Sequence, residues 1–227
     1  MKKGILLLLF SIRVVSIFAQ YESLGSWNII NLRGVLSDKW SFFAEGQVRS
    51  LKYYDDFHYH EFKGGLTFEV NNYFRVSLAT GKYDTYKEGG DFVLPKNNDE
   101  FRIWPQFFLV QPLGKFIIEQ RGRVEMRFST IGYRNRFRYR LAVNYPFGKN
   151  TQGFKPFQLS VSNEIFFTDN EPYFERNRFF LSANYRISPL FSTQLGYMRQ
   201  FDYKINDEIG RAFFLVGAYF DVDFRKK

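Results

Sequence analysis

The sequence contains no cysteine, which excludes disulfide bonds, thiolate metal sites and lipid attachment at an N-terminal cysteine. It also lacks a long apolar run, because Ser11 and Arg13 interrupt the apolar stretches at residues 5–10 and 14–18. A membrane-spanning helix needs about 20 apolar residues, so this segment is too short and too broken to be one. No zinc-ligand spacing, glycine-rich phosphate loop or nucleotide fingerprint is present, and we therefore expect no cofactor and no metal.

The first 19 residues have the pattern of a secretory signal peptide. Lys2 and Lys3 form a basic start, an apolar core follows, and the small residue Ala19 lies at the expected cleavage point. We expect cleavage after Ala19, which leaves residues 20–227 as a single domain. An uncleaved anchor stays open as an alternative, because Arg13 lies within the apolar core.

Between Arg134 and Tyr145 the residues alternate in character with a period of two. Arginines occupy positions 134, 136, 138 and 140, whereas aromatic or aliphatic residues occupy positions 137, 139, 141, 143 and 145. A β-strand turns successive side chains to opposite faces, so this segment has one cationic face and one apolar face. Nearly every segment after residue 25 repeats the alternation. The pattern is typical of a transmembrane β-barrel, with apolar residues toward lipid and polar residues toward the lumen.

The composition agrees with a barrel. Aromatic residues make up 21% of the chain, yet the mean hydropathy is negative. A barrel can present aromatic rings to lipid and keep its charges in the lumen. The formal net charge of +9 does not indicate nucleic-acid binding, because the basic residues alternate with apolar ones and no recognition motif is present. We therefore expect no nucleic-acid partner.

Eleven strands are predicted, and turn residues separate them. Five of the seven prolines lie in the gaps and Pro156 lies at the start of a strand, whereas Pro105 lies well within a strand and predicts a local bulge or bend. An odd strand number conflicts with the even number and periplasmic N-terminus usual for such barrels. We therefore expect residues 21–36, which alternate least cleanly, to run partly inside the barrel or along it and leave ten spanning strands, or the closure to add a further strand. The predicted fold is all-β, a single antiparallel transmembrane β-barrel of ten to twelve strands. The strands cover residues 25–36, 39–51, 57–70, 73–86, 99–111, 114–128, 133–145, 155–167, 174–187, 190–202 and 210–224.

The connections predict an orientation. Bacterial barrels place short turns in the periplasm and long loops outside. On this rule the last strand ends in the periplasm at Phe224, and the first strand begins outside. Tight turns at residues 37–38, 71–72, 112–113 and 188–189 alternate with longer connections at residues 52–56, 87–98, 129–132, 168–173 and 203–209.

Four stretches resemble the outer-membrane family catalogued as domain of unknown function 2490. They are KWSFFAEGQVRSL at residues 39–51, GKYDTYKEGG at 81–90, NNDEFRIWPQ at 97–106 and GYRNRFRYRL at 132–141. The resemblance covers essentially the whole chain after the signal peptide. It implies a Gram-negative outer-membrane barrel and transfers no catalytic residue, because the family has no established activity.

The lumen is predicted to be rich in arginine and glutamate. Two interpretations stay open: a porin-like, narrow pore that prefers anions, since rings of arginine favour anion passage, and a structural barrel whose lumen is plugged because the glutamates pair with the arginines. The predicted lumen-lining residues are Glu45, Arg49, Glu61, Glu100, Arg102, Arg121, Arg123, Glu125, Arg127, Arg134, Arg136, Arg138 and Arg140.

An enzymatic alternative rests on Ser50, His58 and His60. All three have lipid-facing parity next to a short outer connection, and a hairpin would bring the serine near a histidine. A surface lipid hydrolase needs such a nucleophile and base. Against it, no third orienting group is evident, and two histidines among tyrosines also fit an outer aromatic belt.

A third interpretation makes the outer loops a surface for a ligand or a partner. The longest loop, residues 86–98, is acidic and rich in glycine, but its carboxylates lack the spacing of an EF-hand calcium loop. The expected partners are outer-membrane lipid and the barrel-assembly machinery, and the oligomeric state stays open.

Overall fold

Strands form in the segments where the two-residue alternation predicts them. The structure, a computed structural model, describes residues 24–150, 153–203 and 209–225, so the predicted signal peptide, residues 1–19, lies outside the described residues. Within these ranges no helix is long and apolar enough to cross a membrane. The strands are β1 (Leu24–Val35), β2 (Trp40–Lys52), β3 (Asp55–Glu69), β4 (Phe74–Lys87), β5 (Val93–Leu113), β6 (Phe116–Ser129), β7 (Gly132–Phe147), β8 (Phe157–Thr168), β9 (Phe174–Ser188), β10 (Phe191–Asp202) and β11 (Ile209–Asp223).

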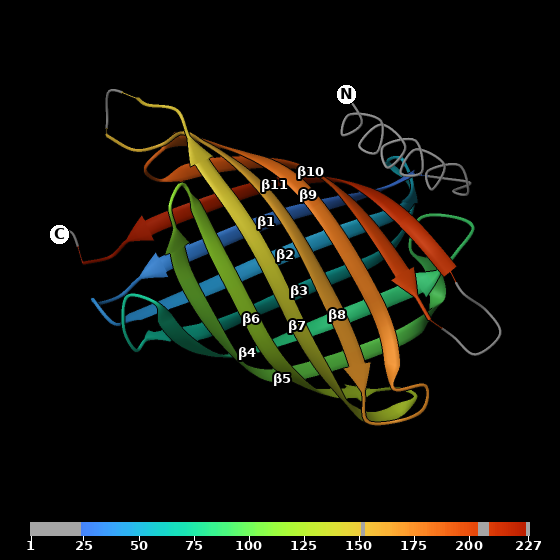
Figure 1. Cartoon of the computed structure of the whole chain (residues 1–227). Coiled ribbons are helices and arrows are strands. Elements are labelled where there is room, and N and C mark those ends of the chain that lie inside the picture. Colours follow the sequence, from blue (N-terminus) through green and yellow to red (C-terminus); the bar gives the residue numbers. More distant parts are fainter. Residues whose placement is uncertain (1–23, 151–152, 204–208, 226–227) are drawn as a thin grey trace, which may run out of the picture.

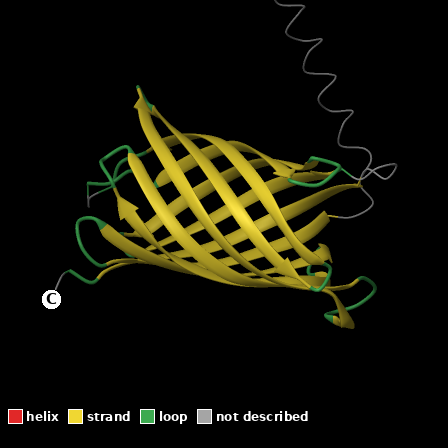
Figure 2. Ribbon diagram, turned by 90° about the horizontal axis from the view of Figure 1, so that it is seen from below, coloured by secondary structure: helices red, strands yellow, loops and turns green. Residues whose placement is uncertain are grey.

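The strands close into a barrel in which each strand pairs with its neighbours in the chain, and β1 pairs with β11 (Figure 1). Consecutive strands are antiparallel, whereas β1 and β11 are parallel. This follows from the odd number, because hairpins reverse the direction at each step and the first and eleventh strands then run the same way. Figure 2 shows that the strands forming the wall are tilted relative to the barrel axis, with loops at both ends of the barrel. The predicted fold class is confirmed, with a strand number inside the predicted range.

The expectation for the first strand is wrong. β1 lies neither inside nor along the barrel, and the closure needs no further strand. Its register with β11 runs from Leu24 opposite Ala212 to Val35 opposite Asp223, and its other edge pairs with β2. The weak alternation of β1 reflects its lumen face, where Trp27 is buried among apolar residues.

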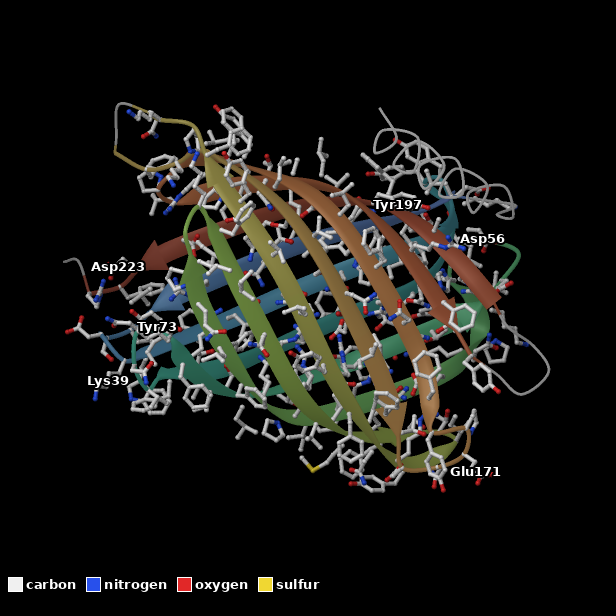
Figure 3. The ribbon with its side chains drawn as sticks, viewed as in Figure 1. Lys39, Asp56, Tyr73, Glu171, Tyr197 and Asp223 are labelled. Carbon is white, nitrogen blue, oxygen red and sulfur yellow. The ribbon has the colours of Figure 1, made fainter. Side chains whose placement is uncertain are left out.

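The barrel has two mouths. The C-terminal mouth, where β11 ends, carries connections 36–39, 70–73, 114–115, 148–156 and 189–190. The N-terminal mouth, where β1 begins, carries connections 53–54, 88–92, 130–131, 169–173 and 203–208. Figure 3 shows Lys39, Tyr73 and Asp223 at the first, and Asp56 and Glu171 at the second.

The predicted contrast between tight turns and long loops is wrong. The longest connection, 148–156, lies at the C-terminal mouth, and connections 53–54 and 130–131 at the opposite mouth are short because the strands extend into them. The lengths of the connections therefore do not fix the orientation of the barrel.

Pro105 interrupts one hydrogen-bonded ladder without shifting the register. It pairs with Leu78 of β4, and on the β6 side the pairing passes from Ile103 opposite Met126 to Gln106 opposite Arg123 in the same register. The predicted bulge is therefore absent. Proline has no N–H to donate, so only its pairing with one neighbouring strand is lost.

The two faces of the wall carry different side chains. On β9, Phe179 and Leu181 point outward and are 43% and 47% exposed, while Arg178 and Ser182 lie on the other parity and are buried. The same sorting recurs on the other strands, and the outer surface is a band of aliphatic and aromatic residues. Because one face of every strand is apolar, a shift of one residue would expose the buried charges, so the register is strongly specified.

Candidate functional site: a network of arginine and glutamate inside the barrel

The lumen brings together the residues that the alternation assigns to it. Of the thirteen predicted lumen residues, twelve line one of two internal cavities. The thirteenth, Glu125, has no exposed surface and lies at the centre of the ion-pair network.

Four arginines surround Glu125. Arg136 donates to Oε2 from Nε at 2.8 Å and from Nη2 at 2.5 Å. Arg138 and Arg123 donate to Oε1 at 2.5 and 3.1 Å, and Arg102 Nη1 lies 3.9 Å from Oε2. A buried carboxylate is costly unless it is paired and hydrogen-bonded, and here both oxygens are bonded.

An aromatic ring completes this cross-section of the lumen. Phe166 of β8 has no exposed surface, and the guanidinium carbons of Arg138 and Arg136 lie 4.5 and 5.4 Å from its ring centroid, within cation–π range. These residues bring charge pairs and a ring together in one cross-section of the lumen. We call Arg102, Glu125, Arg136, Arg138 and Phe166 the central layer.

Other carboxylates extend the network along the same wall. Glu100 accepts from Arg102 Nε at 2.7 Å and from Arg127 Nη2 at 2.8 Å. Glu164 accepts from Arg121 Nη2 at 2.5 Å and from Arg138 Nε at 3.0 Å. Guanidinium forks suit such shared contacts, because each offers several N–H donors in one plane.

The opposite wall carries a smaller network. Arg49 Nη2 lies 2.9 Å from Glu61 Oε2, and Lys63 bridges Glu61 and Glu45 at 2.5 and 2.6 Å. The Arg49 guanidinium also lies 3.4 Å from the ring centroid of Trp27. The cation is therefore held both by a carboxylate and by an aromatic face.

The remaining two arginines lie nearer the mouths. Arg134 Nη2 is 3.8 Å from Glu175, and Arg140 donates to Glu119, which also accepts from Arg75 Nη2 at 3.0 Å. Their side chains are more exposed than those of the central layer, at 36% for Arg134 and 29% for Arg140. Exposed ion pairs contribute little to stability, so these two pairs matter less for folding.

Three cavities lie along the lumen. A central cavity of about 570 Å³ shares Arg33, Arg140 and four further lining residues with a cavity of about 700 Å³ at the C-terminal mouth. A third cavity, of about 650 Å³ at the N-terminal mouth, shares only Arg49 with the central one. The central layer lies between these last two: Arg138 lines the central cavity, and Arg102 and Arg136 line the N-terminal mouth cavity.

The alternation did not predict how much of the lumen is aromatic. Trp27, Tyr83, Trp104 and Phe166 point inward and are buried, and aromatic or aliphatic neighbours pack around the first three in two clusters. Their sequence signal is parity: Trp104, for example, lies between Arg102 and Gln106, two positions from each. Arginine guanidinium groups lie over the rings of Trp27, Tyr83 and Trp104. The rings therefore occupy part of the lumen that charged side chains alone would leave empty.

The structure does not assemble the candidate serine and histidine site. Ser50 is fully buried, donates to the Lys52 carbonyl oxygen at 2.6 Å, accepts from the Ser26 N–H at 3.0 Å and lies 2.6 Å from the Ser26 hydroxyl. Among the described residues, neither histidine forms a hydrogen bond with it. The serine is therefore a packing element of the wall and not an exposed nucleophile.

A β-bulge explains why the parity of His58 is different from the expected one. The β2–β3 pairing passes from Arg49 opposite Tyr59 to Ser50 opposite Phe57, so His58 is the extra residue and lines the N-terminal mouth cavity. The expectation that His58 faces lipid is wrong. His60 lies on the other side of the bulge, in contact with Tyr86 at 3.1 Å between Nε2 and the hydroxyl oxygen.

The predicted outer loop is shorter than expected and is tied to the wall. β5 begins at Val93, which reduces the connection to residues 88–92. Asp56 accepts hydrogen bonds from the backbone N–H groups of Gly89 and Gly90 at 3.1 to 3.2 Å. In the described ranges no three histidine, aspartate or glutamate residues form a group that could hold a metal ion. This connection offers neither a free loop nor a ligand cluster.

The fold and the network define the class: a closed, eleven-stranded β-barrel with a charged interior. The chain belongs to the family described as protein of unknown function (DUF2490), whose sequence profile matches residues 24–210. One similar solved structure is "LpxR from Salmonella typhimurium", with 10% sequence identity, a TM-score of 0.48, and coverage of 79% of this chain and 83% of that chain. A likeness this distant carries no argument about activity. No curated protein matches the sequence.

Proposed function

We propose that this protein is an outer-membrane β-barrel whose lumen is closed by the central layer, so that it serves a structural role and does not conduct ions at rest. One observation carries this proposal: Glu125 and Phe166 have no exposed surface and lie between two cavities that share only Arg49. An ion crossing the barrel would have to separate Glu125 from arginines at 2.5 Å. Breaking a buried ion pair costs several kcal/mol, roughly 3 to 5.

The outer surface supports the membrane location. Leu66, Leu181, Leu195 and Phe220, on four different strands, are 41 to 55% exposed, and similar residues ring the barrel. Soluble monomers rarely expose a continuous apolar patch of more than a few hundred Å². A band of aliphatic and aromatic side chains around a closed barrel matches the lipid-facing surface of outer-membrane proteins.

The route to the membrane is part of the same proposal. Residues 1–19 act as a cleaved signal peptide, and residues 20–227 are inserted into the outer membrane of a Gram-negative cell by the barrel-assembly machinery. Outer-membrane lipid is then the partner of the apolar band. Neither the histidines nor the loop at 88–92 gives comparable support to hydrolysis or to loop binding.

Replacing Leu181 by arginine tests the membrane location. Leu181 lies at the middle of β9 and faces outward, so Leu181→Arg is expected to lower the free energy of unfolding from a bilayer by about 2 to 4 kcal/mol. The matched control is Ile187→Arg, one residue before the end of the same strand and equally exposed, with an expected cost of about 0 to 1 kcal/mol. Equal costs at the two positions, measured by denaturant titration in vesicles, would contradict a bilayer around β9.

A narrow pore that prefers anions is the second candidate. It is favoured by the surplus of positive charge, since nine arginine or lysine residues and four glutamates line the central cavity. The two candidates differ in a planar bilayer. The closed lumen predicts no discrete conductance, whereas the pore predicts steps with anion selectivity.

A further inference from the structure

The central cavity has more positive charge than its carboxylates compensate. Its lining combines nine cationic side chains with four glutamates in about 570 Å³. The cavity shares only Arg49 with the N-terminal mouth cavity, whereas it shares six lining residues with the cavity at the C-terminal mouth. Burying charge without a partner is costly, so a site with this balance favours a mobile anion.

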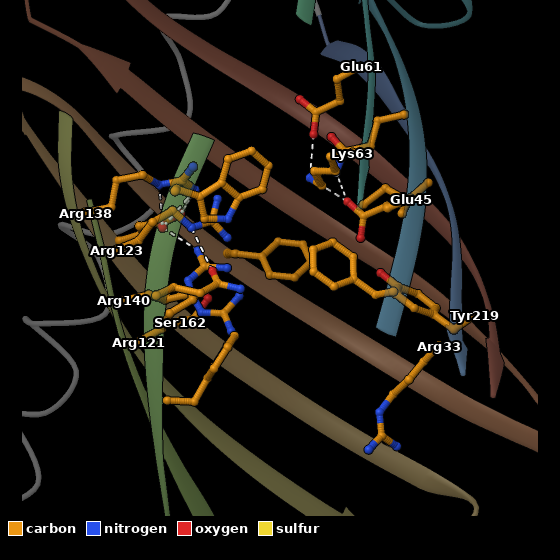
Figure 4. Close-up of a pocket in the computed structure, with 18 of the residues that line it drawn as sticks. Arg33, Glu45, Glu61, Lys63, Arg121, Arg123, Arg138, Arg140, Ser162 and Tyr219 are labelled. Carbon is orange, nitrogen blue, oxygen red and sulfur yellow. Dashed lines mark hydrogen bonds and ion pairs between the residues drawn. The ribbon is translucent and has the colours of Figure 1, made fainter. Parts of the chain in front are cut away.

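Strand pairing concentrates part of the surplus on β6 and β7. Arg121 lies directly opposite Arg140, and Arg123 directly opposite Arg138, and all four line the central cavity. Figure 4 shows these four side chains gathered on one side of the cavity. Like charges directly across a strand pair are destabilising, so these positions need compensation from elsewhere. We call these four residues the arginine quartet.

The glutamates near the quartet are shared with other cations. Glu119 accepts from Arg140 and also from Arg75 at 3.0 Å. Glu125 forms ion pairs with Arg123 and Arg138 of the quartet, but also with Arg136 outside it. Glu164 forms ion pairs with two members of the quartet, Arg121 and Arg138. The carboxylates of the described residues therefore compensate the quartet incompletely.

Unused donors and one further cation point to the same cavity. Arg49 Nε, Trp104 Nε1 and Arg140 Nε are buried and find no acceptor among the described residues, and all three side chains line the central cavity. Trp104 has no exposed surface at all. Arg178, also in the lining, is buried and donates to Gln200 at 2.8 Å, and no carboxylate of the described residues forms an ion pair with it.

We propose that the central cavity is a binding site for a small multivalent oxyanion, of which phosphate is the simplest member. Planar guanidinium groups form paired hydrogen bonds with phosphate oxygens, and a multivalent anion compensates several arginines at once. The volume is in the range of ligand pockets, which hold about 300 to 1,000 Å³. The inference rests on the closed lumen proposed above, because the central layer makes the cavity a blind pocket instead of a passage.

The test is the thermal stability of the full mature protein in a neutral detergent, titrated with inorganic phosphate. We expect the Tm to rise with phosphate and not with chloride at the same ionic strength, because a ligand that binds the folded state stabilises it. Arg121→Gln and Arg140→Gln are each expected to raise the phosphate dissociation constant about tenfold, the effect of losing one charged hydrogen bond. Without phosphate, Arg121→Gln also loses its ion pair with Glu164 and Arg140→Gln its ion pair with Glu119, so the phosphate-dependent rise in Tm is measured for each variant relative to the same variant without phosphate.

Arg134→Gln is the matched control. It removes a lumen arginine from the N-terminal mouth cavity, on the other side of the central layer, and the dissociation constant is expected to stay within about twofold of the wild type. Equal Tm shifts in phosphate and chloride would overturn the proposal. So would a loss of affinity in Arg134→Gln as large as that in Arg121→Gln.

The outcome is separable from that of the closed lumen. A barrel that conducts ions but binds phosphate through the quartet would contradict the closed lumen alone. A barrel that does not conduct ions and whose Tm does not rise specifically with phosphate would contradict the anion site alone. The neutral detergent keeps lipid phosphate out of the experiment, so binding reports the free oxyanion.

Discussion

Replacing Glu125 by glutamine is expected to lower the free energy of unfolding by about 3 to 5 kcal/mol, the cost of breaking a buried ion pair by removing one partner. Glu125 has no exposed surface, and Arg123, Arg136 and Arg138 all donate to it. The amide keeps the size of the side chain but removes its charge, so three buried cations lose a shared counter-charge. Urea titration of the refolded protein in vesicles measures the change.

Glu119→Gln is the matched control for Glu125→Gln. Glu119 also lies in the lumen and pairs with Arg75 and Arg140, but its side chain is 18% exposed and water screens the pairs. Its loss is expected to cost less than half as much. If both variants lost the same stability, the central layer would not be the strongest part of the network.

Truncating Phe166 to alanine is expected to cost about 3 to 5 kcal/mol, the range for removing a buried aromatic ring. The ring has no exposed surface, and the guanidinium carbons of Arg138, Arg178 and Arg136 lie 4.5 to 5.4 Å from its centroid. The variant leaves a void in the central layer and removes the aromatic face beneath these cations. The same titration in vesicles measures the loss.

Phe167→Ala is the control, because it makes the same chemical change at the next residue on the opposite face of β8. Phe167 is 40% exposed on the outer surface. The lipid can fill the space that the ring leaves, so the expected loss is less than half of that for Phe166→Ala. A larger loss at Phe167 than at Phe166 would contradict the assignment of the two faces.

The regular part of the fold could be predicted because the charged lumen and the apolar outer surface impose opposite demands on alternate residues. In β7 the arginines at positions 134, 136, 138 and 140 leave one arrangement only, with the aromatic residues between them on the outside. The same constraint applies to β9 and most other strands, whose predicted bounds match the structure within a few residues. The family resemblance seen in the sequence is confirmed by the match over residues 24–210.

The β-bulge, the closure of the barrel and the ion-pair partners depend on contacts between residues far apart in the sequence, which a local residue pattern does not predict. The bulge that turns His58 into the lumen arises from how β2 pairs with β3, and the parallel pairing of β1 with β11 arises from the total number of strands. The partners within the network are remote in sequence, since Arg121 on β6 meets Glu164 on β8, past the intervening strand β7. Parity gives the face of each side chain but not its partner.

The proposed closure of the lumen has a direct test in single-channel recording. The mature protein, residues 20–227, is refolded, inserted into a planar bilayer and held under a salt gradient. Protection from added protease in vesicles confirms that the barrel is folded and inserted. We predict a stable bilayer without discrete conductance steps, because the central layer separates the two mouths. Reproducible steps with a reversal potential that favours anions would contradict the closed lumen and support the narrow pore.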